Sequence, residues 1–499
     1  MRSPILFIPL TTAPGRRRAC WLAVVLLAGC AGTVPDTTPG GPGAPVAERW
    51  HAPLPHGAQL ADPALWWSQF DDPQLERLIA AGQQASPTLA QAGARIADAR
   101  AASVARGAAL LPSLNTDISA SRARSDIGAP VGVSSSAALQ ASWELDLFGA
   151  HRAGAGAARA QLESSQAGWH AARVALAAEI ATAYVDLRAC EAQLAQTGID
   201  ARSRARTAQL TGLAAEAGFQ APAAADLARA SAAQGATLLV QQGARCDLAV
   251  KMLVVLTALE ETALRRDLAA ATARMPQPAE LGVAAVPAEV LAQRPDIHAA
   301  ARDVVAASAQ ADQSRAQRWP RVTLSGNIGA SRVSSGAVTT NGSVWTIGPV
   351  SVTLPLFDGG TLRANAQAAQ TRYQSATTVY AARLREAVHD VEKALVTLQS
   401  TAARGADTEA AAAGFERSYR ATEAGHQAGI TSLFQLEDAR RSMLAAQGAL
   451  IELRRESVIA SISLYRAVGG GWTGAAGPAI ADLREPPSTH TGGRSAPQQ

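Results

Sequence analysis

Two stretches of the chain change from the periodicity of a strand to that of a helix. Between Val350 and Leu356 apolar and polar residues alternate, which is typical of a strand with one apolar face. After Gly360 the apolar residues recur every three or four positions, which indicates one stripe of a helix. Leu139–Leu147 alternate in the same way and lead into a helical run after Phe148-Gly149. The sequence therefore predicts two strands that each pass through a glycine turn into a long helix.

These two transitions belong to a longer internal repeat. Three pairs of markers are separated by 208 to 211 positions: Pro112 and Pro320, Phe148 and Phe357, and Gly218 and Gly429. A constant spacing between several markers is the signature of duplication. We predict two tandem repeats, residues 61–275 and 276–471.

Each repeat is expected to contain one β-hairpin, over 112–148 in the first and 320–357 in the second. The second strands are predicted at Ser136–Phe148 and up to Phe357, and both are long enough to cross a membrane as tilted strands. Four strands cannot close a membrane barrel, and an open sheet edge in lipid costs several kcal/mol per unpaired backbone group. If the hairpins are in a membrane, two or three copies must complete the barrel.

The rest of each repeat is predicted to be helical. Pro87 marks a break between two helices near the start. The second repeat contains a helix from Thr361 to about Glu423, and its partner returns over about Leu433–Val468. The corresponding returning helix of the first repeat is expected over about Ala223–Leu264. Helices of this length that double back on each other, rich in alanine, indicate closely packed coiled coils.

The N-terminal segment has the pattern of a leader. Arg16–Arg18 precede an apolar run, Ala19–Leu27, that is too short for a permanent membrane helix. The run ends in Leu27-Ala28-Gly29-Cys30, which resembles the lipobox of bacterial lipoproteins. This resemblance implies a signal peptide over 1–29, cleavage before Cys30, and covalent diacylglycerol and N-acyl lipid on that cysteine; an ordinary signal peptide is the alternative. Residues 30–60, rich in Gly, Pro and Thr, are predicted to form a tether, and 472–499 a disordered tail.

Composition excludes several classes of function. The formal net charge is +4, but Arg2 and Arg16–Arg18 supply four positive charges in the leader, so no basic patch indicates a nucleic-acid partner. No catalytic motif or metal-ligand spacing is present, so neither an enzyme nor a cofactor site is predicted. Cys190 and Cys246 stand singly in helical stretches, and we interpret each as a buried free thiol.

Several motifs, in order and covering about residues 61–471, resemble the outer-membrane factors of tripartite efflux pumps, the TolC-type channels, and within them the lipidated NodT-like branch. The motifs are Trp66-Trp67 with Phe70-x-Asp72-Pro73-x-Leu75, Arg294-Pro295-Asp296-Ile297, Trp319-Pro320-x-Val322, Leu354-Pro355-Leu356-Phe357-Asp358-Gly359-Gly360, and the segment Gly429–Gln447. The resemblance implies a mixed α and β fold in which a homotrimer forms a twelve-stranded outer-membrane barrel continuous with a periplasmic helical barrel. It also implies a passive exit duct for small molecules, with a periplasmic adaptor protein, an inner-membrane transporter and outer-membrane lipid as partners.

Two sets of residues become functional candidates under this resemblance. The polar side of the strands is expected to line a water-filled lumen, through Asn115, Asp117, Gln140, Glu144, Asp146 and Asn327. The family closes its channels at the periplasmic helix turns, which implies gate candidates at Asp438, Glu437, His426 and Gln435. An exposed ion pair between Asp438 and Arg441 is the alternative interpretation of that carboxylate.

A different class of protein also accounts for part of the pattern. A lipid-anchored periplasmic coiled-coil adaptor without its own pore would explain the lipobox and the long helices. It would leave the four long, two-faced strands unexplained. The mass of the detergent-solubilised protein distinguishes the two classes, because only the channel needs several copies.

Overall fold

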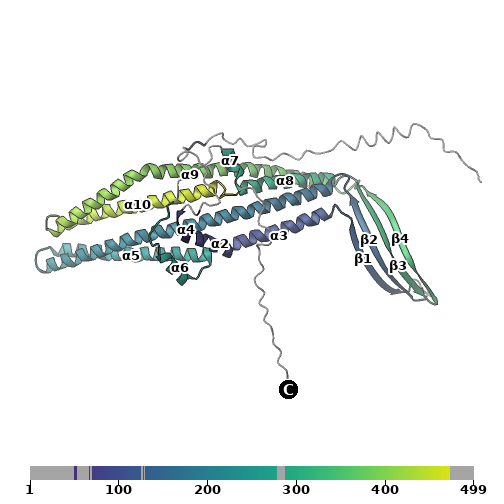
Figure 1. The fold of residues 1–499 in the computed structure, drawn as a ribbon, viewed down its shortest axis with the longest axis horizontal. Coiled ribbons are helices and arrows are strands. Elements are labelled where there is room, and N and C mark those ends of the chain that lie inside the picture. Colours follow the sequence, from purple (N-terminus) through teal and green to yellow (C-terminus); the bar gives the residue numbers. More distant parts are fainter. Residues whose placement is uncertain are drawn as a thin grey trace, which may run out of the picture.

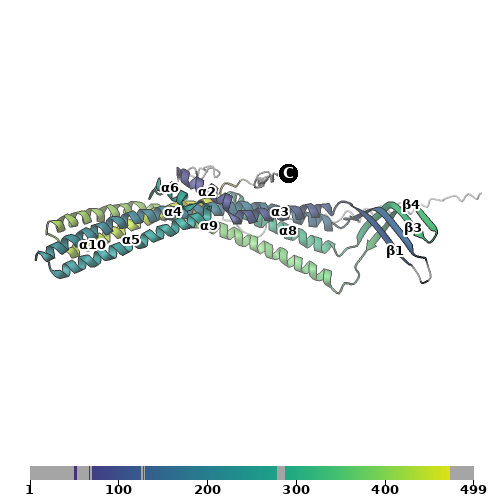
Figure 2. The same ribbon diagram turned by 90° about the horizontal axis from the view of Figure 1, so that it is seen from below.

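The computed structural model describes residues 50–52, 67, 70–124, 127, 130–277 and 287–472. The molecule is elongated, with a sheet at one end and two helical hairpins at the other (Figures 1 and 2). The predicted leader, Cys30, most of the tether and the tail after residue 472 lie outside the described residues.

The two halves of the chain contain the same series of elements. In order they are α2 (Pro73–Ala85), α3 (Pro87–Ala108), β1 (Ser113–Ala123), β2 (Gly132–Leu145), α4 (Ala150–Glu216), α5 (Pro222–Thr257), α6 (Glu261–Ala269), α7 (Pro287–Ala292), α8 (Pro295–Ala316), β3 (Arg321–Ser335), β4 (Val338–Thr353), α9 (Thr361–Gln427) and α10 (Leu433–Ala467). The series α3-β1-β2-α4-α5 returns as α8-β3-β4-α9-α10. Helices α4 and α9 both have 67 residues, which corresponds to roughly 100 Å of helix.

The four strands form one antiparallel sheet in the order β1-β2-β3-β4. β1 pairs with β2 and β3 with β4, as the alternating patterns predict for two hairpins. The pairing of β2 with β3 joins the hairpins of the two halves, from Gly132 opposite Ser335 to Leu145 opposite Val322. The sheet is therefore continuous across both halves of the chain.

The strands β2 and β4 end three or four residues earlier than predicted. Asp146 follows β2 directly and its carboxylate accepts hydrogen bonds from the backbone N–H groups of His151, at 3.1 Å, and Arg152, at 2.8 Å. After β4, Pro355 has no N–H to donate to a ladder. Because of these features, the pairing of the strands ends at Leu145 and Thr353, although the apolar pattern continues to Phe148 and Phe357.

The break at Pro87 is confirmed: Ser86 caps α3, and its hydroxyl accepts from the Leu89 N–H. The prediction that the helix after Gly218 continues to Leu264 is wrong. α5 ends at Thr257, and Ala258 adopts φ +53°, a left-handed conformation that ends a helix. In the part of the chain that the structure describes, no helix has an apolar stretch long enough to cross a membrane.

Helix α4 is the centre of the helical packing and contacts α2, α3, α5, α8 and α10. Small buried residues such as Ala157, Ala160 and Ala181 allow these helices to approach closely. The Asp72-Pro73 motif binds to the same helix: Asp72 caps α2 and also accepts a 2.7 Å hydrogen bond from the Tyr184 hydroxyl. Burial, followed by this contact with Asp72, raises the pKa of Tyr184 to about 12.

The interpretation of Cys190 and Cys246 as free thiols is wrong, because the two cysteines form a disulfide. Cys190 lies on α4 and Cys246 on α5, with a Cα–Cα distance of 5.5 Å. Gly218, in the turn between these helices, lies midway between them, 28 residues from each. Two antiparallel helices of equal pitch bring residues equidistant from the turn to the same level. The spacing around Gly218 was the signal that sequence reasoning missed.

Replacing both cysteines with alanine, Cys190→Ala with Cys246→Ala, should lower the free energy of unfolding by about 2–4 kcal/mol, because the unfolded chain loses a closed loop. Chemical denaturation with and without a reductant measures this. The reductant should destabilise the wild type to the level of the double variant and leave the variant unchanged. Alkylation of both cysteines in the folded, unreduced wild type would contradict the assignment.

Candidate functional site

The register of the sheet places the predicted polar residues on one face. Asn115 pairs with Gln140, and Gln140 pairs with Asn327 on its other side, so the three form a row across β1, β2 and β3. Asp117 lies two residues along β1 on the same face, and Glu144 four residues along β2. Thr346 of β4 completes the row opposite Asn327. One face of the sheet therefore has a continuous polar surface.

The opposite face is apolar. Leu139, Ile328 and Trp345 form a row across β2, β3 and β4, and Ile118 continues this face on β1. In the single chain Trp345 is 67% exposed and Ile118 78% exposed. Exposed apolar surface of this extent marks contact with a membrane or another protein rather than with water.

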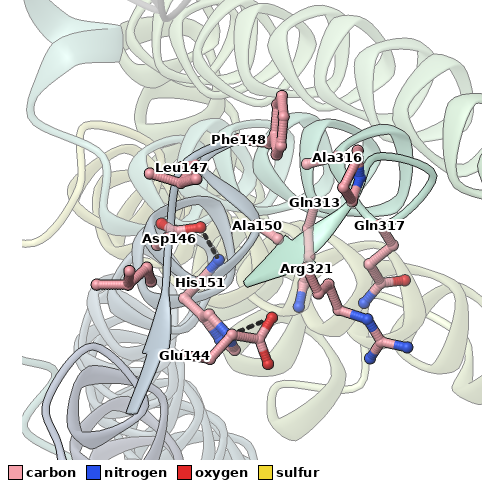
Figure 3. Close-up of a pocket in the computed structure, with 12 residues that line it drawn as sticks. Glu144, Asp146, Leu147, Phe148, Ala150, His151, Gln313, Ala316, Gln317 and Arg321 are labelled. Atoms are coloured by element: carbon pink, nitrogen blue, oxygen red, sulfur yellow. Dashed lines mark hydrogen bonds and ion pairs between the residues drawn. The ribbon is translucent and has the colours of Figure 1, made fainter. Parts of the chain in front are cut away.

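The predicted residues nearest the helices are held in the junction between sheet and helices (Figure 3). Glu144 Oε1 lies 3.2 Å from His151 Nε2, and Asp146 binds the backbone of the first turn of α4. They border a cavity of about 80 Å³ together with Gln313 and Arg321. Glu144 and Asp146 are thus occupied with the junction, whereas Asn115, Asp117, Gln140 and Asn327 lie on the open polar face.

The second half uses the same device at its own junction. The Asp358 carboxylate accepts hydrogen bonds from the backbone N–H groups of Leu362, at 2.7 Å, and Gly360, at 2.9 Å. These donors hold the pKa of the Asp358 carboxyl below its usual value. Gly149 and Gly360 have φ of +79° and +90°, which side chains disfavour. At each junction, an aspartate side chain and a glycine with positive φ therefore form the connection between the end of the hairpin and the start of the long helix.

At the far end of the molecule, two of the predicted gate residues stabilise the turn between α9 and α10. His426 Nδ1 lies 3.0 Å from the backbone oxygen of Thr431. Gln435 and Ser432 form a capping box at the start of α10, in which each side chain binds the other's backbone. Asp438 is exposed and lies 3.4 Å from the Arg441 guanidinium, the arrangement expected for an ordinary surface ion pair.

Glu437 projects inward and belongs to a group that we name the buried charge cluster: Asp200, Arg204, Glu437 and Arg440. Arg204 binds Asp200 at 2.8 Å and lies 3.5 Å from Glu437. Arg440 is fully buried, pairs with Glu437, and lies 3.5 Å from Asp200. The two acids and two bases alternate, so each charge has oppositely charged neighbours.

Hydroxyl groups from neighbouring helices complete the cluster. Ser231 of α5 donates to Glu437 at 2.8 Å and accepts from Arg204 at 2.8 Å. Arg440 donates to Ser203 of α4 at 3.0 Å, and its guanidinium lies 5.6 Å from the ring centre of Tyr419 on α9. The cluster therefore connects all four helices of the two hairpins. Sequence reasoning missed it, although Arg440 follows Leu433 and Leu436 at the spacing of an inward-facing stripe.

Adjacent arginines offer a matched test of this cluster. Arg440→Met should lower the free energy of unfolding by about 3–5 kcal/mol, because it leaves Glu437 and Asp200 buried with too little positive charge. Arg441→Met should cost less than about 1 kcal/mol, because it removes an exposed pair. Denaturant midpoints of the two variants measure the difference, and equal losses would rule out a special role for Arg440.

A sequence model of the family described as "Outer membrane efflux protein" matches residues 78–257 and 286–470. The pyoverdine export outer membrane protein OpmQ of Pseudomonas putida is 29% identical over 473 residues, covering 91% of this chain and 98% of OpmQ. Nodulation protein T of Rhizobium leguminosarum bv. viciae is 28% identical over 474 residues, covering 94% and 96%.

Solved structures have the same fold. The outer membrane protein VceC of Vibrio cholerae aligns with a TM-score of 0.71 at 26% identity, covering 82% of this chain and 99% of VceC. The outer-membrane channel OprN aligns with a TM-score of 0.75 over 89% of this chain and 99% of OprN; at 24% identity this likeness concerns the fold alone. Both alignments include nearly the whole of the known structure.

Proposed function

The chain belongs to the outer membrane efflux protein family and is an outer-membrane efflux channel, and we propose that it conducts solutes along the polar face of its sheet as a homotrimer. The observation that carries this proposal is the register that gathers Asn115, Gln140 and Asn327 on one face and Ile328 and Trp345 on the other. A polar interior and an apolar exterior are what a membrane barrel with an aqueous lumen requires.

The assembly follows from the sheet edges. β1 and β4 are the outer strands of the four, and each needs a further strand partner in lipid. Three chains would supply twelve strands, with the tandem repeats 61–275 and 276–471 each contributing one hairpin. The long helices would continue the duct through the periplasm toward an adaptor protein and an inner-membrane transporter. Cys30 would carry diacylglycerol and N-acyl lipid, which the intact mass of the purified chain can test.

Neighbouring residues on β3 provide a matched test of the lumen. In planar bilayers, a charged, membrane-impermeant thiol reagent should lower the conductance of an Asn327→Cys channel, because the added groups enter the solute path. The same reagent should leave an Ile328→Cys channel unchanged, because that side chain is on the apolar face. The native disulfide keeps Cys190 and Cys246 from reacting.

Light scattering of the detergent-solubilised protein, corrected for bound detergent, provides the control. A trimer that conducts and responds only at Asn327→Cys supports the proposal. A response only at Ile328→Cys would mean that the apolar face lines the lumen and the polar face is outside it. A monomer without conductance would favour a protein that has no pore of its own.

We place the gate at the helical turn and assign its charge to Asp438. Of the four predicted gate residues, His426 and Gln435 bind the turn and Glu437 belongs to the buried charge cluster. Asp438 is the exposed carboxylate of the set. Three copies around a symmetry axis would attract cations and repel anions.

Asp438→Asn should therefore shift the reversal potential measured in a salt gradient toward lower cation preference. Glu409→Gln is the matched control, since Glu409 is an exposed carboxylate of α9 that pairs with Arg454 at a distance from the turn. A shift of equal size in both variants would mean that Asp438 acts only through the net charge of the channel.

A further inference from the structure

The apolar face of the sheet has a hollow near the end that is farthest from the helices. Its volume is about 580 Å³, and it is bordered by Ile118, Ala120, Ala137, Ala330, Arg332 and Asn341, among others. On each of β1, β2 and β3, three consecutive residues border the hollow. The first and third have side chains on the apolar face, and the one between them has its side chain on the polar face. The hydroxyls of two such intermediate residues, Ser119 and Ser136, bond each other at 2.9 Å on the polar side. The hollow therefore opens on the apolar face.

Short side chains, those of Ala120, Ser135, Ala137 and Ala330, form the floor of the hollow, and Ile118 and Arg332 stand at its sides. Nearer the helices, the row Leu139, Ile328 and Trp345 presents large side chains. Two residues further along the strands, Ala137 pairs with Ala330. The large side chains of this face are thus interrupted by a recess that spans three strands. Across the strands its width is roughly 10 Å at the usual strand spacing.

Two arginines lie near the outer end of this recess: Arg332 borders it, and Arg122 lies just beyond its border on β1. Arg332 follows Ala330 by two residues on β3, and Arg122 follows Ala120 by two residues on β1, so both are on the apolar face. Both are exposed, and among the described residues neither forms an ion pair. Asp117, the acidic residue nearest on β1, is on the opposite face.

The position of the arginines matches the edge of a membrane. From Val322 to Arg332 the strand β3 extends about 33 Å, which at the usual strand tilt of about 40° is a height of about 25 Å, close to that of the apolar band of an outer-membrane barrel. Arg332 comes directly after this band. Arginine on a lipid-facing surface is tolerated at this depth, where it reaches the headgroups, and it binds phosphate well.

We propose that this recess and its two arginines form a binding site for a phosphorylated, multiply acylated glycolipid of the outer leaflet. Acyl chains occupy the recess over Ala137 and Ala330, and Arg122 and Arg332 bind the phosphate groups. Two arginines on separate strands favour a lipid with two phosphate groups, and a recess of about 580 Å³ across three strands favours one with several acyl chains. The inference rests on the proposed function in two respects: the apolar face of the sheet contacts lipid, and the hairpin loops lie at the exterior side of the membrane.

Native mass spectrometry of the purified, full-length assembly tests the site with three probes: a bisphosphorylated lipid A, the same lipid without phosphate, and phosphatidylglycerol. The double variant Arg122→Gln with Arg332→Gln should bind the bisphosphorylated lipid about tenfold more weakly. Ala137→Leu, which fills the recess, should weaken binding of both forms of lipid A. Arg321→Gln, on the polar face of β3 at the helical end, should bind as the wild type does.

Binding that is unchanged in both the double variant and Ala137→Leu would overturn the proposal. So would equal affinity for phosphatidylglycerol, which would mean general headgroup contact by the arginines. Light scattering of each variant verifies that the assembly forms. Conductance of the same preparations separates the two proposals, since a conducting wild type without lipid preference refutes only the lipid site.

Discussion

The outer strands β1 and β4 each have one edge without a strand partner in the single chain. Water can bond the backbone groups of such an edge, but the hydrocarbon of a bilayer cannot. In the homotrimer that we propose, further copies of the chain supply these missing strand partners. The long helices lie close to the same sheet along the chain, because α4 begins five residues after the end of β2 and α9 begins eight residues after the end of β4.

Most of the fold could be predicted because its main elements repeat a simple period over many residues. The alternation of apolar and polar residues predicted the four strands and which residues share each face. The spacing of three or four residues between apolar positions predicted the long helices. The exact ends could not be predicted from period alone. Asp146 ends β2 by binding the backbone of the helix that follows, and Ala258 ends α5 by its own backbone conformation.

The contacts between helices were harder to predict than the helices. Glu437 and Arg440 are separated by three residues, a spacing that on most helices means an exposed pair. Here Arg440 is fully buried and Glu437 is only 15% exposed, because α4 and α5 bring Asp200, Arg204 and Ser231 against them. Cys190 and Cys246 were missed for a similar reason, since their pairing depends on how two helices align about the turn at Gly218. Both cases depend on residues far away in the sequence.

The disulfide has a mechanical consequence. A covalent bond between α4 and α5 prevents these helices from sliding along each other at that level. Helices α9 and α10 are connected by hydrophobic contacts, hydrogen bonds and exposed ion pairs such as Arg404–Glu456 within the described residues, all of which can exchange partners. Among the described residues, the two helices of the first hairpin are therefore joined covalently and those of the second by noncovalent contacts, so a covalent bond limits sliding in the first hairpin alone.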